Sequence, residues 1–203
     1  MFEPAFALLG ATVTWLELWA FLLALACVIC NVFEIHWGWP LAFVSSALYA
    51  WLFLASRLYG EGGLQLFFAG TAAWGWWQWL FGRRVDARGE TEPLAVAHLR
   101  TRVRLAICSL WVIAWPATGF VLAHITDTDV PYFDAFPTIG SVVGQILLGR
   151  KFIENWPVWF VVNVASVGLF VYKGLWLTVV LYVIFALLAL AGWMRWRRVE
   201  AAG

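Results

Sequence analysis

The residues best suited to chemistry are two amides and two indoles that lie within three helical turns, from Asn155 to Asn163. At 100° per residue, Asn155, Trp159 and Asn163 fall on one stripe of a helix, and Trp156 lies beside that stripe. The surrounding apolar run continues to Tyr172 and is long enough to cross a bilayer. An amide that faced lipid there would cost several kcal/mol, so the stripe should face protein, water or a ligand. Amides between indole faces suit a flat heteroaromatic ligand, and we interpret this helix as one wall of a binding site.

A second group of candidates lies in another apolar run, residues 63–81. Gln65, Phe68 and Trp76 share one stripe of the predicted helix, and Trp77 lies one step round from it. Trp77 and Gln65 fit an interfacial position equally well, because Trp residues gather in belts at both membrane surfaces. The sequence therefore leaves two roles open for these two side chains, a solute contact or an anchor at the interface.

Two of the candidate amides also have a structural alternative. Gln145 lies among the small residues Gly140, Ser141 and Gly144, which permit close helix packing, and its side chain could bond across that contact. Asn163 could likewise bond a neighbouring helix, an interaction worth about 0.6 kcal/mol on average. For Asn163 the adjoining indoles favour a solute contact.

The titratable residues form no catalytic or metal-binding pattern. The three histidines lie in or beside connectors without a shared ligand spacing, and the three cysteines lie in apolar runs that match no zinc motif. No phosphate loop or nucleophile elbow is present, so the sequence predicts no enzyme, no cofactor and no metal. Glu154 is expected at a helix N-terminus beside Arg150 and Lys151. An indole-rich cavity below an acidic rim of Asp127, Asp129 and Asp134 suits a flat cation or a neutral heterocycle.

The composition indicates a helical membrane protein. Of the 203 residues, 64% are hydrophobic and 12% are charged, against about 25% charged residues in soluble domains. Seven apolar runs can be recognised, and a basic connector, 82–103, separates the third from the fourth. The predicted fold is an all-α membrane protein with seven transmembrane helices. The runs are 12–32, 39–56, 63–81, 104–125, 133–149, 152–172 and 174–194.

The distribution of basic residues predicts the orientation of the chain. With seven spans, eleven Lys and Arg residues lie on the side of the C-terminus and two on the side of the N-terminus. The positive-inside rule then places the C-terminus in the cytoplasm and the N-terminus outside the cell (inner) membrane.

An internal repeat appears when the sequence is shifted by 117 residues. The shift lays Trp39-Pro40 over Trp156-Pro157 and Gly75 to Trp79 over Gly192 to Trp196, with no gap between the two matches. Two three-helix copies thus flank one extra helix, which restores the direction of the second copy and predicts a parallel repeat. This 3+1+3 arrangement is that of SWEET-type carriers. The predicted parts are a first repeat, 1–81, a basic connector with a linker helix, 82–125, and a second repeat with a basic tail, 126–203.

Four segments of the chain carry a resemblance to a known family. They are Phe133-Asp134-Ala135-Phe136-Pro137, Arg150-Lys151-Phe152-Ile153-Glu154-Asn155-Trp156, Gly75 to Trp79, and the ending Trp193 to Trp196. In these segments the chain resembles the PnuC-type vitamin transporters. The resemblance covers the second to seventh runs. It implies facilitated diffusion of nicotinamide riboside through a SWEET-like fold, with trapping by cytoplasmic phosphorylation and no coupling ion.

The resemblance also implies which residues bind the solute and which partners the chain has. Trp156, Trp159 and Asn163 would contact the nicotinamide and ribose, with Gln65 and Phe68 opposite. Similar carriers transport thiamine or riboflavin, which are the alternative solutes. Members of the family assemble as homotrimers, so the expected partners are the vitamin, the lipid bilayer and two further copies of the chain, and no nucleic acid.

Overall fold

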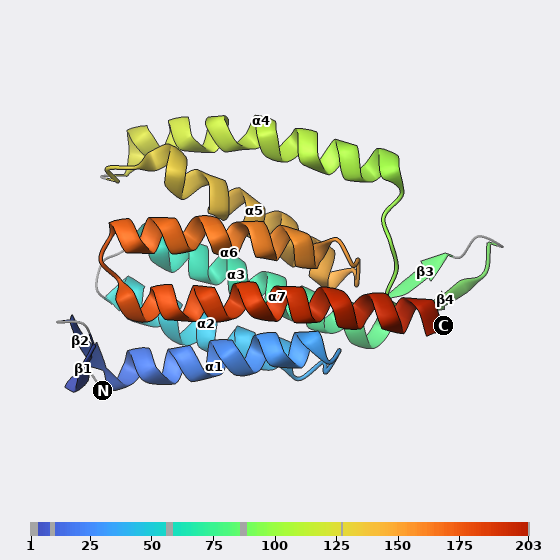
Figure 1. Cartoon of the computed structure of the whole chain (residues 1–203), viewed down its shortest axis with the longest axis horizontal. Coiled ribbons are helices and arrows are strands. Elements are labelled where there is room, and N and C mark those ends of the chain that lie inside the picture. The colour runs from blue at the N-terminus through green and yellow to red at the C-terminus, as the bar shows by residue number, and fades with distance from the viewer. Residues whose placement is uncertain (1–3, 9–10, 56–58, 86–88, 127, 203) are drawn as a thin grey trace. The chain divides into compact units, whose positions relative to one another are not determined.

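The computed structural model describes residues 4–8, 11–55, 59–85, 89–126 and 128–202, and within them the chain forms seven helices and two pairs of short strands (Figure 1). Each predicted apolar run corresponds to one helix, so the expectation of seven helices is confirmed. The helices are α1 (Trp15–Val32), α2 (Gly38–Ala55), α3 (Tyr59–Phe81), α4 (Thr101–Ile125), α5 (Pro131–Gly149), α6 (Asn155–Tyr172) and α7 (Trp176–Ala202).

The description of the chain as all-α needs one correction, because two antiparallel strand pairs accompany the helices. Strand β1 (Pro4–Leu8) pairs with β2 (Ala11–Thr14) before α1, and β3 (Arg83–Val85) pairs with β4 (Thr91–Pro93) inside the basic connector. These strands have three to five residues each, which is too short for an alternating hydrophobic pattern to reveal them.

Three of the helices in the described part of the chain, α4, α6 and α7, are long and apolar enough to cross a membrane by length and composition. Shorter apolar stretches lie in α1 and α2, at Phe21–Val32 and Gly38–Leu48. Helix α4 continues through Pro116, which lacks a backbone N–H donor. These features define a helical membrane protein.

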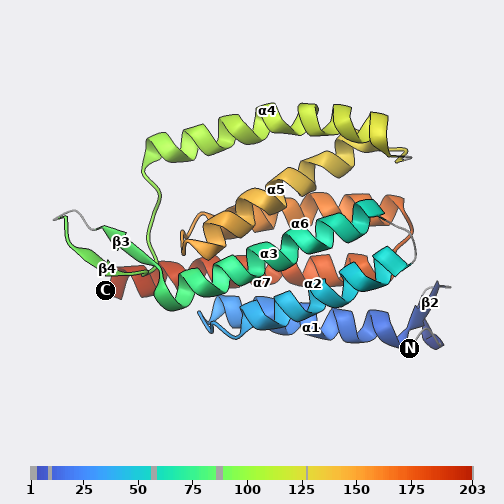
Figure 2. The ribbon, with the colours of Figure 1, turned by 180° about the vertical axis from the view of Figure 1, so that it is seen from behind.

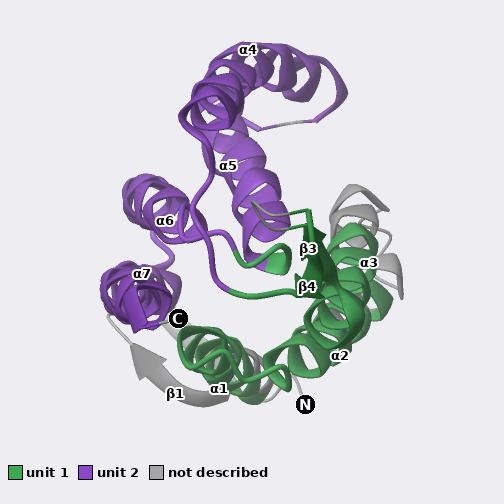
Figure 3. Ribbon diagram, turned by 90° about the vertical axis from the view of Figure 1, so that its right-hand side faces the viewer, with its two compact units in different colours: residues 1–95, 149–151 green, residues 96–148, 152–203 purple. Residues whose placement is uncertain are grey.

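The chain forms two compact units, shown in different colours in Figure 3. The first unit comprises residues 1–95 and 149–151, and the second comprises 96–148 and 152–203. In the first unit, α2 packs along α3, as Figure 2 shows, and α1 packs against α2. In the second unit, α6 packs along α7.

The tightest helix contact in the first unit places an indole over a glycine. Trp39 of α2 is 2% exposed, and a methyl group added at Gly75 of α3 would lie 2.3 Å from its ring. The Trp39 ring also meets Trp79 edge to face, with centroids 5.6 Å apart and planes at 77°. Any residue larger than glycine at position 75 would therefore force α2 and α3 apart.

The second unit contains the same kind of contact. Trp156 of α6 is 2% exposed, a methyl group at Gly192 of α7 would lie 2.6 Å from its ring, and Trp196 meets it edge to face at 5.4 Å and 89°. These three residues lie 117 positions after Trp39, Gly75 and Trp79. The first residues of α6 and α7 likewise lie 117 positions after those of α2 and α3.

Helix α4 is bound to α5 by indole donors. The Trp111 N–H donates to the Phe136 carbonyl oxygen at 3.2 Å, and the Trp115 N–H donates to the Tyr132 carbonyl oxygen at 2.6 Å. The Trp111 ring also stacks on Phe136, with centroids 5.1 Å apart. Both indole bonds join α4 to the first half of α5, which also contains Pro137.

Candidate solute-binding site

Helix α6 begins at Asn155, two residues before Pro157, and a proline is well tolerated in the first turn of a helix. Pro157 is its third residue, a position whose backbone N–H has no partner inside the helix, so the proline costs nothing there. The Asn155 side chain donates to the Phe152 carbonyl oxygen at 2.7 Å and so joins the start of α6 to the preceding turn. The first turn of α6 therefore holds Asn155 and Trp156 in fixed positions.

The buried face of α6 includes three polar side chains. Asn155 is completely buried, Asn163 is 4% exposed and Ser166 is 3% exposed, whereas Val161 and Val164 on the other side of the helix are about half exposed. The amides thus point toward protein, as their common stripe predicts. Such buried polar groups are stable only when they are hydrogen-bonded, because desolvation without a partner costs several kcal/mol in an apolar medium.

Two polar atoms on this face lack a hydrogen-bond partner among the described residues. They are the Asn155 side-chain oxygen and the Trp156 indole nitrogen, both buried. An orphaned donor or acceptor costs about 1–3 kcal/mol, so a group that can bond both atoms would bind favourably. They are one acceptor and one donor, the two types of hydrogen-bonding group that a carboxamide also carries.

Trp159 lies against α5. A methyl group at Gly144 would lie 2.9 Å from the Trp159 ring, so glycine is required for this approach. Gln145 follows directly in α5 and is half-buried. The structure thus places Gln145 one residue from the contact between α5 and the indole of Trp159.

In the first unit, α3 carries the other predicted candidates. Gln65 and Phe68 are both partly buried, and the same stripe continues to Ala72, which is 1% exposed. The Trp76 indole N–H donates to the His36 ring nitrogen at 3.4 Å. Trp77 points away from this face and is 55% exposed, which suits the interfacial belt better than a solute contact.

Ser166 is a polar residue of the buried α6 face that the sequence analysis missed. It lies three residues after Asn163, a spacing that places both side chains on one face of a helix. This spacing was the available signal, although serine is common in helix contacts and carries little information by itself.

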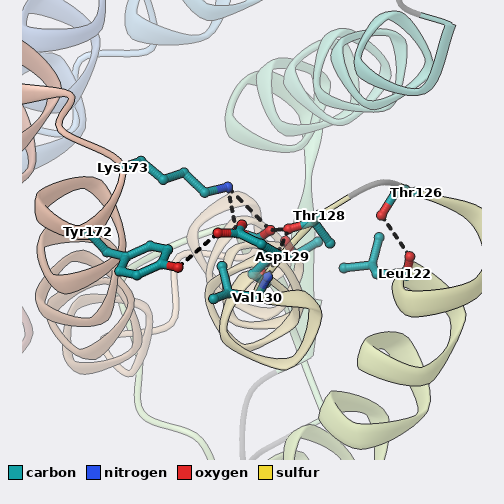
Figure 4. A network of polar contacts seen from close by, with 9 residues as sticks. Leu122, Thr126, Thr128, Asp129, Val130, Tyr172 and Lys173 are labelled. Atoms are coloured by element: carbon teal, nitrogen blue, oxygen red, sulfur yellow. Dashed lines mark hydrogen bonds and ion pairs between the residues drawn. The ribbon is translucent and has the colours of Figure 1, made fainter.

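The acidic residues of the predicted rim that the structure describes are paired (Figure 4). The Lys173 ammonium contacts both Asp134 carboxylate oxygens, at 3.2 and 3.4 Å, and the Thr128 hydroxyl donates to the same carboxylate. The Tyr172 hydroxyl donates to Asp129 at 2.9 Å. Asp127 lies outside the described residues. The rim therefore attracts cations less strongly than three free carboxylates would.

Glu154 lies at the N-terminus of α6, as the sequence predicts, and its partners come from a distant segment. Its carboxylate contacts the Arg104 guanidinium at 2.7 Å, the His98 ring at 3.0 Å and the Leu99 backbone N–H at 3.1 Å. Residues 98–104 thus reach the start of α6 from far away in the sequence. Its charge is compensated, so Glu154 is a structural residue.

The described residues contain no cluster of three or more His, Cys, Asp or Glu side chains that could hold a metal ion. Apolar helices that bury amides and indoles on one face are typical of a multi-pass membrane protein that accommodates a polar solute. A family model described as nicotinamide mononucleotide transporter matches residues 14–198. The chain belongs to this family.

Individual relatives agree with this assignment. The nicotinamide riboside transporter PnuC of Escherichia coli is 25% identical, and the match covers 92% of this chain and 87% of the relative. The riboflavin/roseoflavin transporter RibM of Streptomyces davaonensis is also 25% identical, over 97% of this chain and 92% of the relative. Both relatives are named as transporters, so the function of the family is transport and not catalysis.

A solved structure has the same fold. The crystal structure of the vitamin B3 transporter PnuC superposes with a TM-score of 0.71, at 22% identity, over 91% of this chain and 81% of that protein. At this identity the likeness concerns the fold alone.

Proposed function

We propose that this chain carries nicotinamide riboside across the cell membrane by facilitated diffusion. The observation that carries the proposal is the uncharged face of α6, which holds two buried amides, the buried indole of Trp156 and the half-buried indole of Trp159. The E. coli relative, which is named as a nicotinamide riboside transporter, supports the choice of solute.

In this proposal each part of the solute has a matching group. The indoles of Trp156 and Trp159 attract the pyridinium ring, a cation–π contact worth about 2 kcal/mol or more once water is excluded. The amides of Asn155 and Asn163 bond the carboxamide and the ribose hydroxyls. Gln145 of α5 and the α3 residues Gln65 and Phe68 supply further contacts.

We propose the riboside rather than the mononucleotide, although the family description names the latter. Helices α3, α5 and α6, which carry all the candidate residues, contain no Lys or Arg. A phosphate buried beside them would lose its hydration without gaining a cation, at a cost of several kcal/mol. A neutral ribose hydroxyl carries no such penalty.

The proposed architecture is seven membrane crossings in a SWEET-like 3+1+3 parallel repeat, formed by residues 1–81 and 126–203 with 82–125 between them. The recurrence of helix starts and of the Trp–Gly–Trp packing at an interval of 117 residues supports it. The N-terminus lies outside and the C-terminus lies in the cytoplasm, as the basic residues predict. Homotrimer formation, which the family resemblance implies, is part of the same proposal.

Transport is proposed as uniport, with phosphorylation in the cytoplasm trapping the riboside. Counterflow of labelled riboside into proteoliposomes tests the uniport. We expect exchange that needs no ion gradient and is unchanged by ionophores that collapse proton and sodium gradients. Uptake that stops when either gradient collapses would contradict uniport.

A sibling vitamin is the second candidate solute. The RibM relative, which is named as a riboflavin/roseoflavin transporter, matches this chain over 97% of its length. Riboflavin and thiamine also present flat heteroaromatic rings that indoles can stack on. Competition of each vitamin with labelled riboside distinguishes the candidates, because the true solute competes at the lowest concentration.

A further inference from the structure

Two turns of the chain share an uncommon backbone conformation. Glu34, between α1 and α2, has a φ of 56°, and Lys151, between α5 and α6, has a φ of 53°. Within the described ranges they are the two non-glycine residues with positive φ. This left-handed conformation is sterically unfavourable for residues with a Cβ atom and often marks functional positions. The two residues lie 117 positions apart, the interval that relates α2 to α6.

The side chains of these two residues bind each other. The Lys151 ammonium lies 3.2 Å from a Glu34 carboxylate oxygen, and the side chains are 13% and 21% exposed. The same ammonium lies 4.9 Å from the centroid of the Trp79 ring. A pair that is this well shielded is screened less by salt than a surface pair, and the ring adds a cation–π contact.

Three successive residues of the α5–α6 turn, 149–151, belong to the first unit and contact its side chains. Figure 3 shows residues 149–151 in the colour of that unit. Gly149 packs on the Trp74 ring, where a methyl group would lie only 2.4 Å away. The Arg150 guanidinium donates to the Gln78 side-chain oxygen at 3.1 Å.

Arg84 of β3 contributes a further bond to this turn. Its guanidinium donates to the Arg150 carbonyl oxygen and to the Ala95 carbonyl oxygen, the latter at 2.9 Å. Burial, and after it the charge of Arg150, lowers the pKa of Arg84. The turn is thus held by groups of α3 and β3 as well as by Glu34.

The charges at the two equivalent positions are opposite. A carboxylate in one turn and an ammonium in the other attract each other, whereas two copies of either residue would repel. In a carrier built from two repeats, each end of the solute path must open in turn. An attraction between corresponding turns would hold one end closed until it is broken.

We propose that Glu34 and Lys151 form a clasp between the α1–α2 turn and the α5–α6 turn, and that this clasp parts once in every transport cycle. The inference rests on the proposed transport function and on the proposed repeat. Glu34 and Lys151 are not among the candidate solute-binding residues. The proposed role of the clasp is therefore to control a conformational change and not to bind the solute.

The first test is a charge-reversal cycle read out by thermal unfolding in detergent, which needs no solute. Glu34→Lys and Lys151→Glu should each lower the midpoint by a few degrees, and the double reversal should recover at least half of the loss. Glu34→Gln and Lys151→Arg serve as controls that remove and keep the attraction, respectively. A double reversal as unstable as the sum of the single variants would overturn the clasp.

The second test asks whether the clasp must open. Glu34→Cys and Lys151→Cys are combined in a variant whose native cysteines, Cys27, Cys30 and Cys108, are replaced by alanine. Linking the two thiols with a short reagent that contains a cleavable disulfide should reduce riboside counterflow at least tenfold, and reductive cleavage should restore it. Each single-cysteine variant, treated identically, should retain its counterflow.

The outcomes separate the clasp from the proposed function. Linked protein with unchanged counterflow would overturn the clasp, because a static bond tolerates a permanent link. Absence of counterflow in the unlinked, reduced protein would count against the proposed solute instead. In that case the charge-reversal cycle still decides whether the pair exists.

Discussion

The first and second three-helix segments contain the same helix contact with almost the same geometry. In each, an indole near the start of one helix covers a glycine of the next, and a second indole meets it edge to face. The ring centroids are 5.6 Å apart in the first copy and 5.4 Å in the second. The two sets are Trp39, Gly75 and Trp79, and Trp156, Gly192 and Trp196.

The polar residues beside this contact differ between the two copies. Asn155 and Asn163 of α6 correspond to Gly38 and Ser46 of α2 at the interval of 117 residues. Asn155 and Asn163 are buried, at 0% and 4% exposure. The comparison teaches that the packing serves the fold in both copies, whereas the amides that we assign to solute recognition occur in one copy only.

The strongest test of the shared packing adds a methyl group at each glycine. Gly75→Ala and Gly192→Ala place a Cβ atom 2.3 and 2.6 Å from the facing indole and should each destabilise the protein by about 1–3 kcal/mol. Gly70→Ala is the matched control in α3, because nothing lies within 4 Å of its added Cβ. Thermal unfolding in detergent measures all three variants, and an unchanged midpoint for either packed glycine would break the comparison.

A smaller effect, on riboside affinity, should distinguish the indole of Trp156 from that of Trp39. Trp39→Phe and Trp156→Phe remove equally buried indoles, so both should lower the unfolding midpoint similarly. Riboside affinity should fall about tenfold, or about 1.4 kcal/mol, in Trp156→Phe and less than twofold in Trp39→Phe. Isothermal titration calorimetry measures both affinities. Equal losses would mean that both copies recognise the solute.

The ion pair of the acidic rim should contribute less to stability and to transport than the buried indoles do. Lys173→Met removes the ion pair with Asp134, in which the lysine side chain is 34% exposed, and should cost no more than about 1 kcal/mol of stability. Riboside counterflow should change less than threefold, and the difference should shrink at high salt. A tenfold loss of counterflow would show that the rim takes part in solute capture.

The smallest expected effect is that of added nicotinamide mononucleotide on riboside counterflow. Nicotinamide mononucleotide should leave riboside counterflow unchanged at concentrations at which unlabelled riboside competes fully. The reason is the lack of Lys and Arg in α3, α5 and α6. Competition at similar concentrations would refute the assignment of an uncharged site.

The sequence predicted the helices well because spanning length and apolar character are local properties. The fixed interval between Trp39 and Trp79, repeated in Trp156 and Trp196, also indicated corresponding positions before any geometry was known. The buried orientation of Asn155 and Asn163 followed from their common helical stripe.

Other features depend on contacts between distant segments and leave no local signal. Glu154 binds Arg104 and His98, about fifty residues away, rather than its neighbours in the sequence. Trp77 differs from Trp76 by one helical step, so only the packed structure shows that Trp77 points outward. The left-handed conformations of Glu34 and Lys151 were equally hidden, because neither residue type favours that region.

The most direct measurement is the dissociation constant of nicotinamide riboside for the wild-type protein, Asn163→Leu and the matched variant Ser46→Ala, determined by calorimetry in detergent. Removing the Asn163 amide should weaken binding by at least about a hundredfold, since a buried hydrogen-bonding partner of the solute is lost. Ser46→Ala should bind within threefold of wild type, and both variants should unfold as single cooperative species. An Asn163→Leu variant that remains folded and binds the riboside with wild-type affinity would contradict the assignment of the site to α6.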